Sequence, residues 1–342
     1  MAATAIASPP AGRADEAVRS VQASELRLTA RSLGGVILVA GLAWLGFYAF
    51  SRTYPFVFNG SYLIGSTKRK LAATGPVFSA PADVARMAVF GHSQILSGFV
   101  PARFDALADG RVQSFNFGVP GTPYFLPLLK PMLQRGEVPK YVLMVEDWRK
   151  WPPPGPAIDV IDSDEVYLRE LFPFRDLGRD VLTFLINSRQ RGGISAYYDT
   201  GRRAVSSMLA DRGFYFIEGQ SRYKNHELPA SFSLPTDRPE LTEPRKAVPG
   251  GPHFDYLRSA ARQYGFKIFM IPSVRRVGER APLPAINSEL AERLKAYPEF
   301  RIVGPDYLVL ENRYFSDPAH LNPQGAAKYT ETVYELMREY LP

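Results

Sequence analysis

The sequence predicts an α/β protein whose mostly parallel β-sheet is covered by helices on both faces and preceded by one membrane-spanning helix. Three observations favour this fold class. From about residue 84 onwards, short apolar runs alternate with helix-like segments, which is the order that parallel sheets require. Glycine or proline ends several of those runs. An uncharged apolar stretch, 33–50, comes before that region.

The first 82 residues divide into three parts. Residues 1–31 are rich in Ala, Ser and Arg without apolar periodicity, so we expect a flexible tail. The apolar stretch is just long enough to cross a bilayer, and we place a transmembrane helix at 32–51. A cleavable signal peptide is the alternative, but no small-x-small cleavage motif follows the stretch. Residues 52–82 are expected to form a connector, because Gly, Pro and Ser interrupt their apolar stretches.

The folded domain is expected to cover residues 83–342. Apolar runs suited to a sheet buried on both faces predict strands at 85–91, 112–118, 140–148, 264–272 and 299–310. Apolar residues at helical spacing predict helices at 95–109, 123–136 and 286–297, and a final helix from Pro323 onwards.

An insertion of about a hundred residues, 150–255, separates the third and fourth predicted strands. We expect helices in its first half, at 162–172 and 177–190. Its second half, 227–251, has a proline every few residues and cannot hold a regular element. Such a segment is a lid, a binding surface or a solvated loop without a partner, and the sequence leaves these open.

Composition excludes several classes of function. The chain has no cysteine, which rules out disulfides, thiolate metal sites and a cysteine nucleophile, and this fits an exported bacterial protein. Its net charge of +7 is scattered and no basic-aromatic motif accompanies it, so no nucleic-acid partner is expected. His226 and His253 stand alone and are interpreted as surface histidines rather than ligands. We therefore expect no metal and no cofactor.

Ser93 follows the first predicted strand within "VFGHSQILSG". Ligands of open α/β sheets bind at the carboxyl ends of strands, so a serine here is placed to meet a substrate. Its backbone N–H would also be able to donate to an oxyanion. The alternative is a serine that caps the next helix.

Asp317 and His320 lie three residues apart just before the final predicted helix. A serine nucleophile needs an imidazole that takes its proton and a carboxylate that holds the imidazole tautomer, and this pair supplies both. Gly118, at the end of the second predicted strand, would add an unobstructed backbone N–H. The alternatives are a helix cap with a surface histidine, and a glycine needed only for a turn.

In this order, the three blocks resemble those of the SGNH, or GDSL-like, hydrolase superfamily. The resemblance spans roughly residues 84–342, interrupted by the insertion. It implies a three-layer, flavodoxin-like sandwich, a Ser93–His320–Asp317 triad, and an oxyanion hole that includes the amides of Ser93 and Gly118.

Two positions depart from the family pattern. Where the family carries an asparagine that completes the oxyanion hole, this chain has Asp147 and Trp148, and an ionised aspartate cannot donate a hydrogen bond. His92 stands where the family pattern has an aspartate. We predict that His92, Asp147, Trp148 and Asn322 contribute to the pocket rather than to the triad.

Together with the N-terminal span, the blocks resemble the membrane-anchored envelope branch of the superfamily. That branch includes the alginate and cellulose O-acetylation proteins and the D-alanyl transfer protein of lipoteichoic acid synthesis. The resemblance implies a serine esterase or O-acyltransferase in the bacterial inner membrane, with its domain on the periplasmic or extracellular side. It also implies an exported glycan or acyl ester as substrate and a membrane-bound O-acyltransferase as partner. Charges flanking the span do not by themselves determine this orientation.

A non-catalytic envelope subunit is the alternative function. In that case the sheet is a scaffold, and the insertion binds polysaccharide or the membrane partner. The missing asparagine favours this alternative, whereas the presence of Ser93, Asp317 and His320 favours catalysis.

Overall fold

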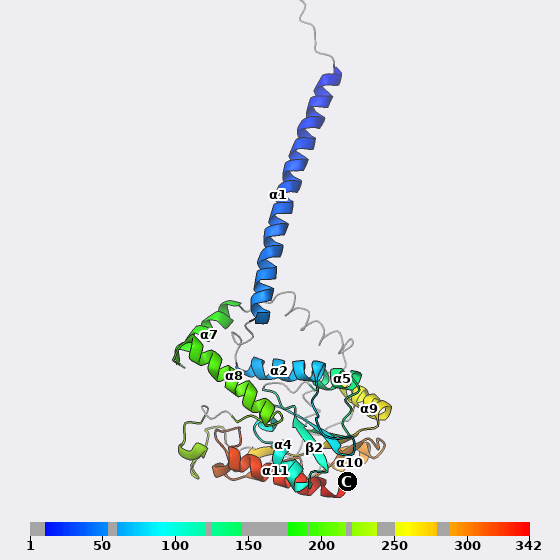
Figure 1. Cartoon of the computed structure of the whole chain (residues 1–342), viewed down its shortest axis with the longest axis vertical. Helices are drawn as coiled ribbons and strands as arrows, with labels where there is room; N and C mark the ends of the chain where they lie inside the picture. Colours follow the sequence, from blue (N-terminus) through cyan, green and yellow to red (C-terminus); the bar gives the residue numbers. More distant parts are fainter. Residues whose placement is uncertain are drawn as a thin grey trace, which may run out of the picture.

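The computed structural model describes residues 11–53, 60–120, 125–145, 177–190, 192–216, 221–237, 250–278 and 288–342. It shows an α/β domain from which one long helix, α1, extends away (Figure 1). The predicted α/β class and the mostly parallel sheet are confirmed.

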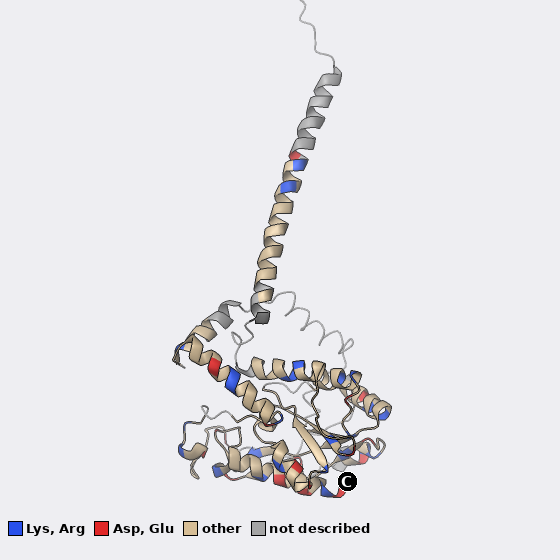
Figure 2. Cartoon of the chain, viewed as in Figure 1, with Lys and Arg blue, Asp and Glu red and all other residues tan. Residues whose placement is uncertain are grey.

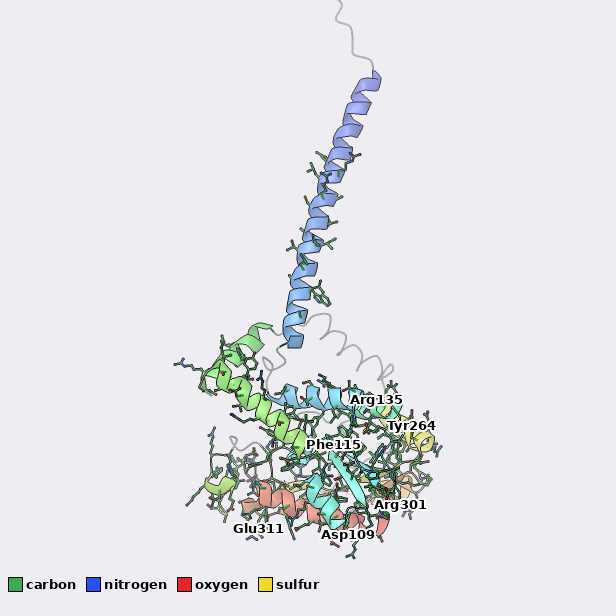
Figure 3. All side chains as sticks on the ribbon, in the orientation of Figure 1. Asp109, Phe115, Arg135, Tyr264, Arg301 and Glu311 are labelled. Carbon is green, nitrogen blue, oxygen red and sulfur yellow. The ribbon has the colours of Figure 1, made fainter. Side chains whose placement is uncertain are left out.

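Helix α1 spans Ala11–Thr53 and contains a segment, Arg27–Gly46, that is long and apolar enough to cross a membrane. None of that segment is buried, and side chains point outward from the helix along its length (Figure 3). The expectation of a flexible tail up to residue 31 was wrong for residues 11–31, which are helical. Once the apolar segment has formed a helix, each added upstream residue gains a hydrogen bond without a new nucleation cost.

Helix α2, Gly60–Thr74, occupies the region predicted to be a connector. Ile64, Lys68 and Ala72 lie four residues apart on one face, and all three are buried. The lysine in the middle of this face hides the apolar periodicity, which explains why the sequence pattern did not predict the helix.

Five parallel strands form the sheet in the order β2-β1-β3-β4-β6. They are β1 Ala85–Phe90, β2 Val112–Asn116, β3 Tyr141–Met144, β4 Lys267–Met270 and β6 Phe300–Ile302. A separate parallel pair consists of β5 Ser273–Arg276, which was not predicted, and β7 Tyr307–Leu310. The single strand predicted at 299–310 is therefore two strands, because Gly304 turns the chain with φ +74°.

Helices cover both faces of the sheet. Side chains of one face, such as Phe90 and Met144, pack with α2, with α5 Leu126–Gln134 and with α9 Pro252–Tyr264. Alternate side chains, such as Val89 and Leu143, pack on the other face with α4 Pro101–Leu107 and α11 Pro323–Met337. The domain also contains short elements: α3 Ser93–Leu96, α10 Ser288–Leu294, and 3-10 turns at Lys224–His226, Asn312–Tyr314 and Arg338–Tyr340.

The insertion is only partly irregular. Helix α7, Leu177–Gln190, confirms the prediction for that segment, whereas α8, Ile194–Ala210, and α9 were not predicted. Residues 227–237 of the proline-rich segment contain no helix or strand, as expected. The helix predicted at 162–172 lies outside the described residues.

Candidate active site

Ser93 is the first residue of α3, directly beyond the carboxyl end of β1. Gly91 makes the turn between them possible, since a Cβ there would lie 2.4 Å from Ile95 Cγ1. His92 precedes the helix as its N-cap, and its Nδ1 accepts a hydrogen bond from the Gln94 amide at 3.2 Å. His92 thus shapes the turn that presents the Ser93 hydroxyl.

A tight turn before α11 presents Asp317 and His320. Its two ends are joined by an antiparallel bridge between Phe315 and Leu321. The Ser316 amide donates to the His320 carbonyl at 2.9 Å. Inside the turn, Asp317 Oδ1 accepts the amides of Ala319 and His320, each at 2.8 Å. These bonds fix both side chains on one side of the turn.

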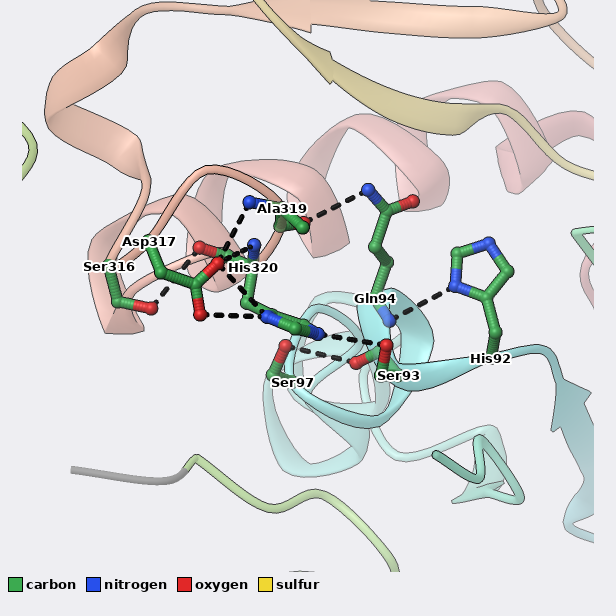
Figure 4. A network of polar contacts seen from close by, with 8 residues as sticks. All are labelled: His92, Ser93, Gln94, Ser97, Ser316, Asp317, Ala319 and His320. Atoms are coloured by element: carbon green, nitrogen blue, oxygen red, sulfur yellow. Dashed lines mark hydrogen bonds and ion pairs between the residues drawn. The ribbon is translucent and has the colours of Figure 1, made fainter. Parts of the chain in front are cut away.

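The three predicted triad residues come together across the two segments (Figure 4). Ser93 Oγ lies 2.8 Å from His320 Nε2. On the other side of the ring, His320 Nδ1 lies 2.8 Å from Asp317 Oδ2 and 3.0 Å from Oδ1. Because the carboxylate oxygens only accept, Nδ1 is the ring nitrogen that carries the proton and Nε2 accepts from the Ser93 hydroxyl. The geometry matches that of a serine nucleophile, a histidine general base and a carboxylate that orients the histidine.

The environment keeps Asp317 ionised. Its partial burial alone would raise the pKa, but the hydrogen bonds from the His320 ring and from the Ala319 and His320 amides hold the pKa below its usual 3.8. The side chains of His320 and Asp317 remain 23% and 21% exposed, so a substrate has access to the pair.

Gln94 connects the two segments that carry Ser93 and His320. Its Nε2 donates to the Ala319 carbonyl at 3.0 Å (Figure 4). The same nitrogen donates to the Val274 carbonyl at 3.3 Å. Helix α3 is thereby tied both to the histidine turn and to β5. No sequence pattern indicates this role, because it depends on three segments distant from one another in the chain.

The backbone amide of Gly118 was expected to be available to an oxyanion, but it already has an acceptor. It donates to Asn116 Oδ1 at 2.8 Å, so this structure does not hold it as a free oxyanion donor. Asn116 is completely buried, and its Nδ2 donates to the carbonyls of Ile95 and Phe99 at 2.6 and 2.8 Å. Asparagine in this position satisfies the carbonyls at the end of α3 and the amide of Gly118 together.

Lys68 of α2 contacts the segment from Asn116 to Gly118, and the sequence did not predict this role. The side chain is completely buried, and its Nζ donates to the carbonyls of Asn116, Gly118 and Gly213 at 2.6–2.7 Å. Burial lowers the Lys68 pKa well below 10.5. Three carbonyls match the three N–H bonds of an ammonium group. Lys68 therefore holds the end of β2 against Gly213, in the segment that follows α8.

Asn322 was predicted to contribute to a pocket, but it is buried at the N-cap of α11. Its Oδ1 accepts the Gly325 amide at 2.9 Å, and its Nδ2 donates to the carbonyls of Arg313 and His226. The surface interpretation was also wrong for His253, whereas His226 is half-buried. His253 is 7% exposed, and Nδ1 of His226 is buried.

Asp147 and Trp148 lie outside the described residues. Among the residues that the structure describes, no group of His, Cys, Asp and Glu is arranged to hold a metal ion. Comparison with protein-family models, with curated proteins and with solved structures finds no match to this chain.

Proposed function

We propose that the protein is a membrane-anchored serine esterase or O-acyltransferase that acts on O-acyl groups of an exported polysaccharide or envelope glycan. The observation that carries the chemistry is the chain of contacts from Ser93 through His320 to Asp317, each 2.8 Å long. The proposed domain architecture is an SGNH-like sandwich, which is supported by the parallel sheet and by the order of Ser93, Asp317 and His320 along the chain.

The reaction begins when Ser93 Oγ attacks the acyl carbonyl and His320 Nε2 takes the hydroxyl proton. Asp317 stabilises the resulting imidazolium. The tetrahedral intermediate then expels the alcohol, which receives the proton from His320, and an acyl ester remains on Ser93. Water or a glycan hydroxyl attacks this ester in the second half, giving hydrolysis or transfer, and the proton returns through His320 to Ser93.

Stabilisation of the oxyanion is incomplete in this conformation. The Ser93 amide belongs to the first turn of α3, where no intrahelical acceptor exists, whereas the Gly118 amide already has one in Asn116. Removing one oxyanion donor typically costs about 2.7–4 kcal/mol of transition-state stabilisation. We therefore propose a slow reaction unless substrate or a partner redirects the Gly118 amide.

The proposed envelope location is supported by α1 and by the family resemblance. Helix α1 contains one segment suited to span a membrane. We propose a single-pass protein of the bacterial inner membrane, with the α/β domain on the periplasmic or extracellular side and a membrane-bound O-acyltransferase as partner.

Exposure of the purified full chain to a fluorophosphonate tests the catalytic proposal. Intact-mass measurement should show one covalent adduct on the wild-type protein and none on Ser93→Ala or His320→Ala. Ser97→Ala is the matched control, because Ser97 lies one turn away, donates to the Ser93 carbonyl at 3.1 Å and takes no part in the proton transfer. This variant should keep the adduct. Absence of labelling on the folded wild-type protein would overturn the proposal.

A non-catalytic envelope subunit is the second candidate, and the engaged Gly118 amide is the observation that favours it. In that case Ser93 would stay unlabelled while the protein still bound acylated polysaccharide. Equilibrium binding of an O-acetylated glycan by wild type and Ser93→Ala, measured beside the labelling, separates the two functions.

A further inference from the structure

The outer face of α7 is apolar, although α7 lies on the surface of the domain. Leu182, Leu185 and Ile186 are 59%, 51% and 49% exposed. Their spacing of three and four residues places them on one helix face. Ile194, at the start of α8, is 52% exposed and lies close after α7 in the chain. Four large apolar side chains thus face outward from one hairpin, and we call them the outer α7 face.

The inner side of α7 is already occupied. The Phe184 ring packs against the rings of Tyr197 and Tyr198 of α8, with centroids 5.3 and 6.2 Å apart. Ser188 is buried on the same side. The hairpin therefore has its own interior contacts, and the outer α7 face is additional to them. An exposed cluster of this kind marks a surface that binds something.

The chain itself holds this hairpin near the segment suited to span a membrane. Helix α1 ends at Thr53 and α2 begins at Gly60, so at most about 25 Å of extended chain separates them. Ile64 of α2 and Met208 of α8 belong to one buried cluster. Figure 1 shows α7 at the end of the domain nearest α1, with α11 at the far end.

The charge of the hairpin also suits a lipid surface. Figure 2 shows the described part of α7 almost without charge. Arg189 follows Ile186 on the same face and is exposed. Further along the hairpin, α8 exposes Arg202 and Arg203 together with one acidic residue, Asp199. An apolar helix face with arginines beside it is typical of helices that lie at the headgroup level of membranes with anionic lipids.

We infer that the outer α7 face inserts into the headgroup–acyl boundary of the same membrane that α1 spans. This second attachment would fix the tilt of the domain relative to the bilayer. The inference rests on α1 as a membrane span and is independent of the chemistry of Ser93.

Site-directed fluorescence in proteoliposomes tests this inference. The chain has no cysteine, so Ile194→Cys carries the only thiol for an environment-sensitive dye. The labelled full chain is reconstituted in vesicles of phosphatidylcholine and phosphatidylglycerol. The acyl chains are brominated near the glycerol backbone in one sample and near the middle of the chain, the depth expected for position 39, in a second. Bromine should quench the dye at position 194. Val39→Cys in α1 is the positive control, and Glu335→Cys on α11, at the far end of the domain, should not be quenched.

A matched variant tests whether α7 is responsible. Replacement of Leu182, Leu185 and Ile186 by serine in the Ile194→Cys background should abolish the quenching at 194 and leave the circular dichroism spectrum unchanged. Quenching that survives this replacement would overturn the inference. Quenching at Val39 without quenching at 194 would also overturn the inference. This holds both if the dye at 194 reports contact with water and if it reports a covering protein segment. Loss of quenching at Val39 as well would refute the anchor itself.

Discussion

The Asp317 carboxylate decides which nitrogen of His320 carries a proton. Both of its oxygens lie within 3.0 Å of Nδ1, and Oδ1 also accepts two backbone amides. A carboxylate that is held in this way leaves Nε2 as the acceptor that faces Ser93. The basic nitrogen of the candidate site therefore depends on Asp317, which lies across the imidazole ring from the Ser93 hydroxyl.

Asp317→Asn should slow fluorophosphonate labelling of Ser93 by about four orders of magnitude while the fold persists. The asparagine amide can donate to Nδ1 and so favour the tautomer with its proton on Nε2, which cannot accept from serine. Labelling kinetics measured beside a thermal melt check this. A variant that labels at the wild-type rate would show that Asp317 does not orient the histidine.

Lys68→Met should lower the free energy of unfolding by at least about 3 kcal/mol, since it leaves the carbonyls of Asn116, Gly118 and Gly213 without their donor. Urea denaturation measures the loss. Lys70→Met is the matched control, because Lys70 lies on the same helix but is exposed, and it should change stability by less than about 0.5 kcal/mol. Equal losses in the two variants would argue against a structural role for the buried ammonium.

At the level of elements, α9 brings a histidine into the core. His253 is in the first turn of α9, and its ring lies 5.7 Å from that of Phe125. Burial lowers the pKa of His253 below its usual 6.5. The unfolded chain therefore takes up a proton at a higher pH than the folded chain does.

Stability should accordingly fall as the pH drops from 6.5 towards the lower pKa of the folded state, and it should level off below that value. His253→Phe, which keeps an aromatic ring against Phe125, should reduce this decline. Melting temperatures at a series of pH values from about 7.5 to 4.5 provide the measurement. An unchanged decline in the variant would mean that other groups cause it.

Helix α11 depends on its N-cap. Asn322→Ala removes the acceptor for Gly325 and the donor to two partly buried carbonyls, so we expect a loss of about 2–4 kcal/mol. Gln324→Ala in the same first turn changes an exposed side chain and should cost less than about 0.5 kcal/mol. Chemical denaturation of both variants tests the difference, and a small effect at Asn322 would contradict the assignment.

Elements whose signal is local could be predicted from the sequence. The strand before Ser93 contains the apolar run 87–90, and the Asp317–His320 pair stands immediately before a helix that begins with proline. Helix α2 could not be predicted, because a lysine occupies the centre of its buried face. The hydrogen-bond acceptor of the Gly118 amide could not be predicted from the sequence either. It depends on how the Asn116 side chain packs beneath α3, and no spacing along the chain encodes that contact.

For the whole molecule, the proposed orientation can be tested in intact cells. Glu25→Cys precedes the candidate span and Glu335→Cys lies on α11, and each would be the only thiol in the chain. A membrane-impermeant maleimide should label position 335 from outside and reach position 25 only after the inner membrane is permeabilised. The opposite pattern would place the domain in the cytoplasm.

Ser93 and His320 are 227 residues apart, and the turn that holds His320 leads directly into α11, which packs against α4. A nascent or truncated chain that already contains Ser93 therefore lacks its base until α11 has been synthesised and has docked. If Ser93 has the proposed chemistry, it would become reactive only at the end of folding, so partly made chains would not attack acyl esters in the compartment where they are synthesised.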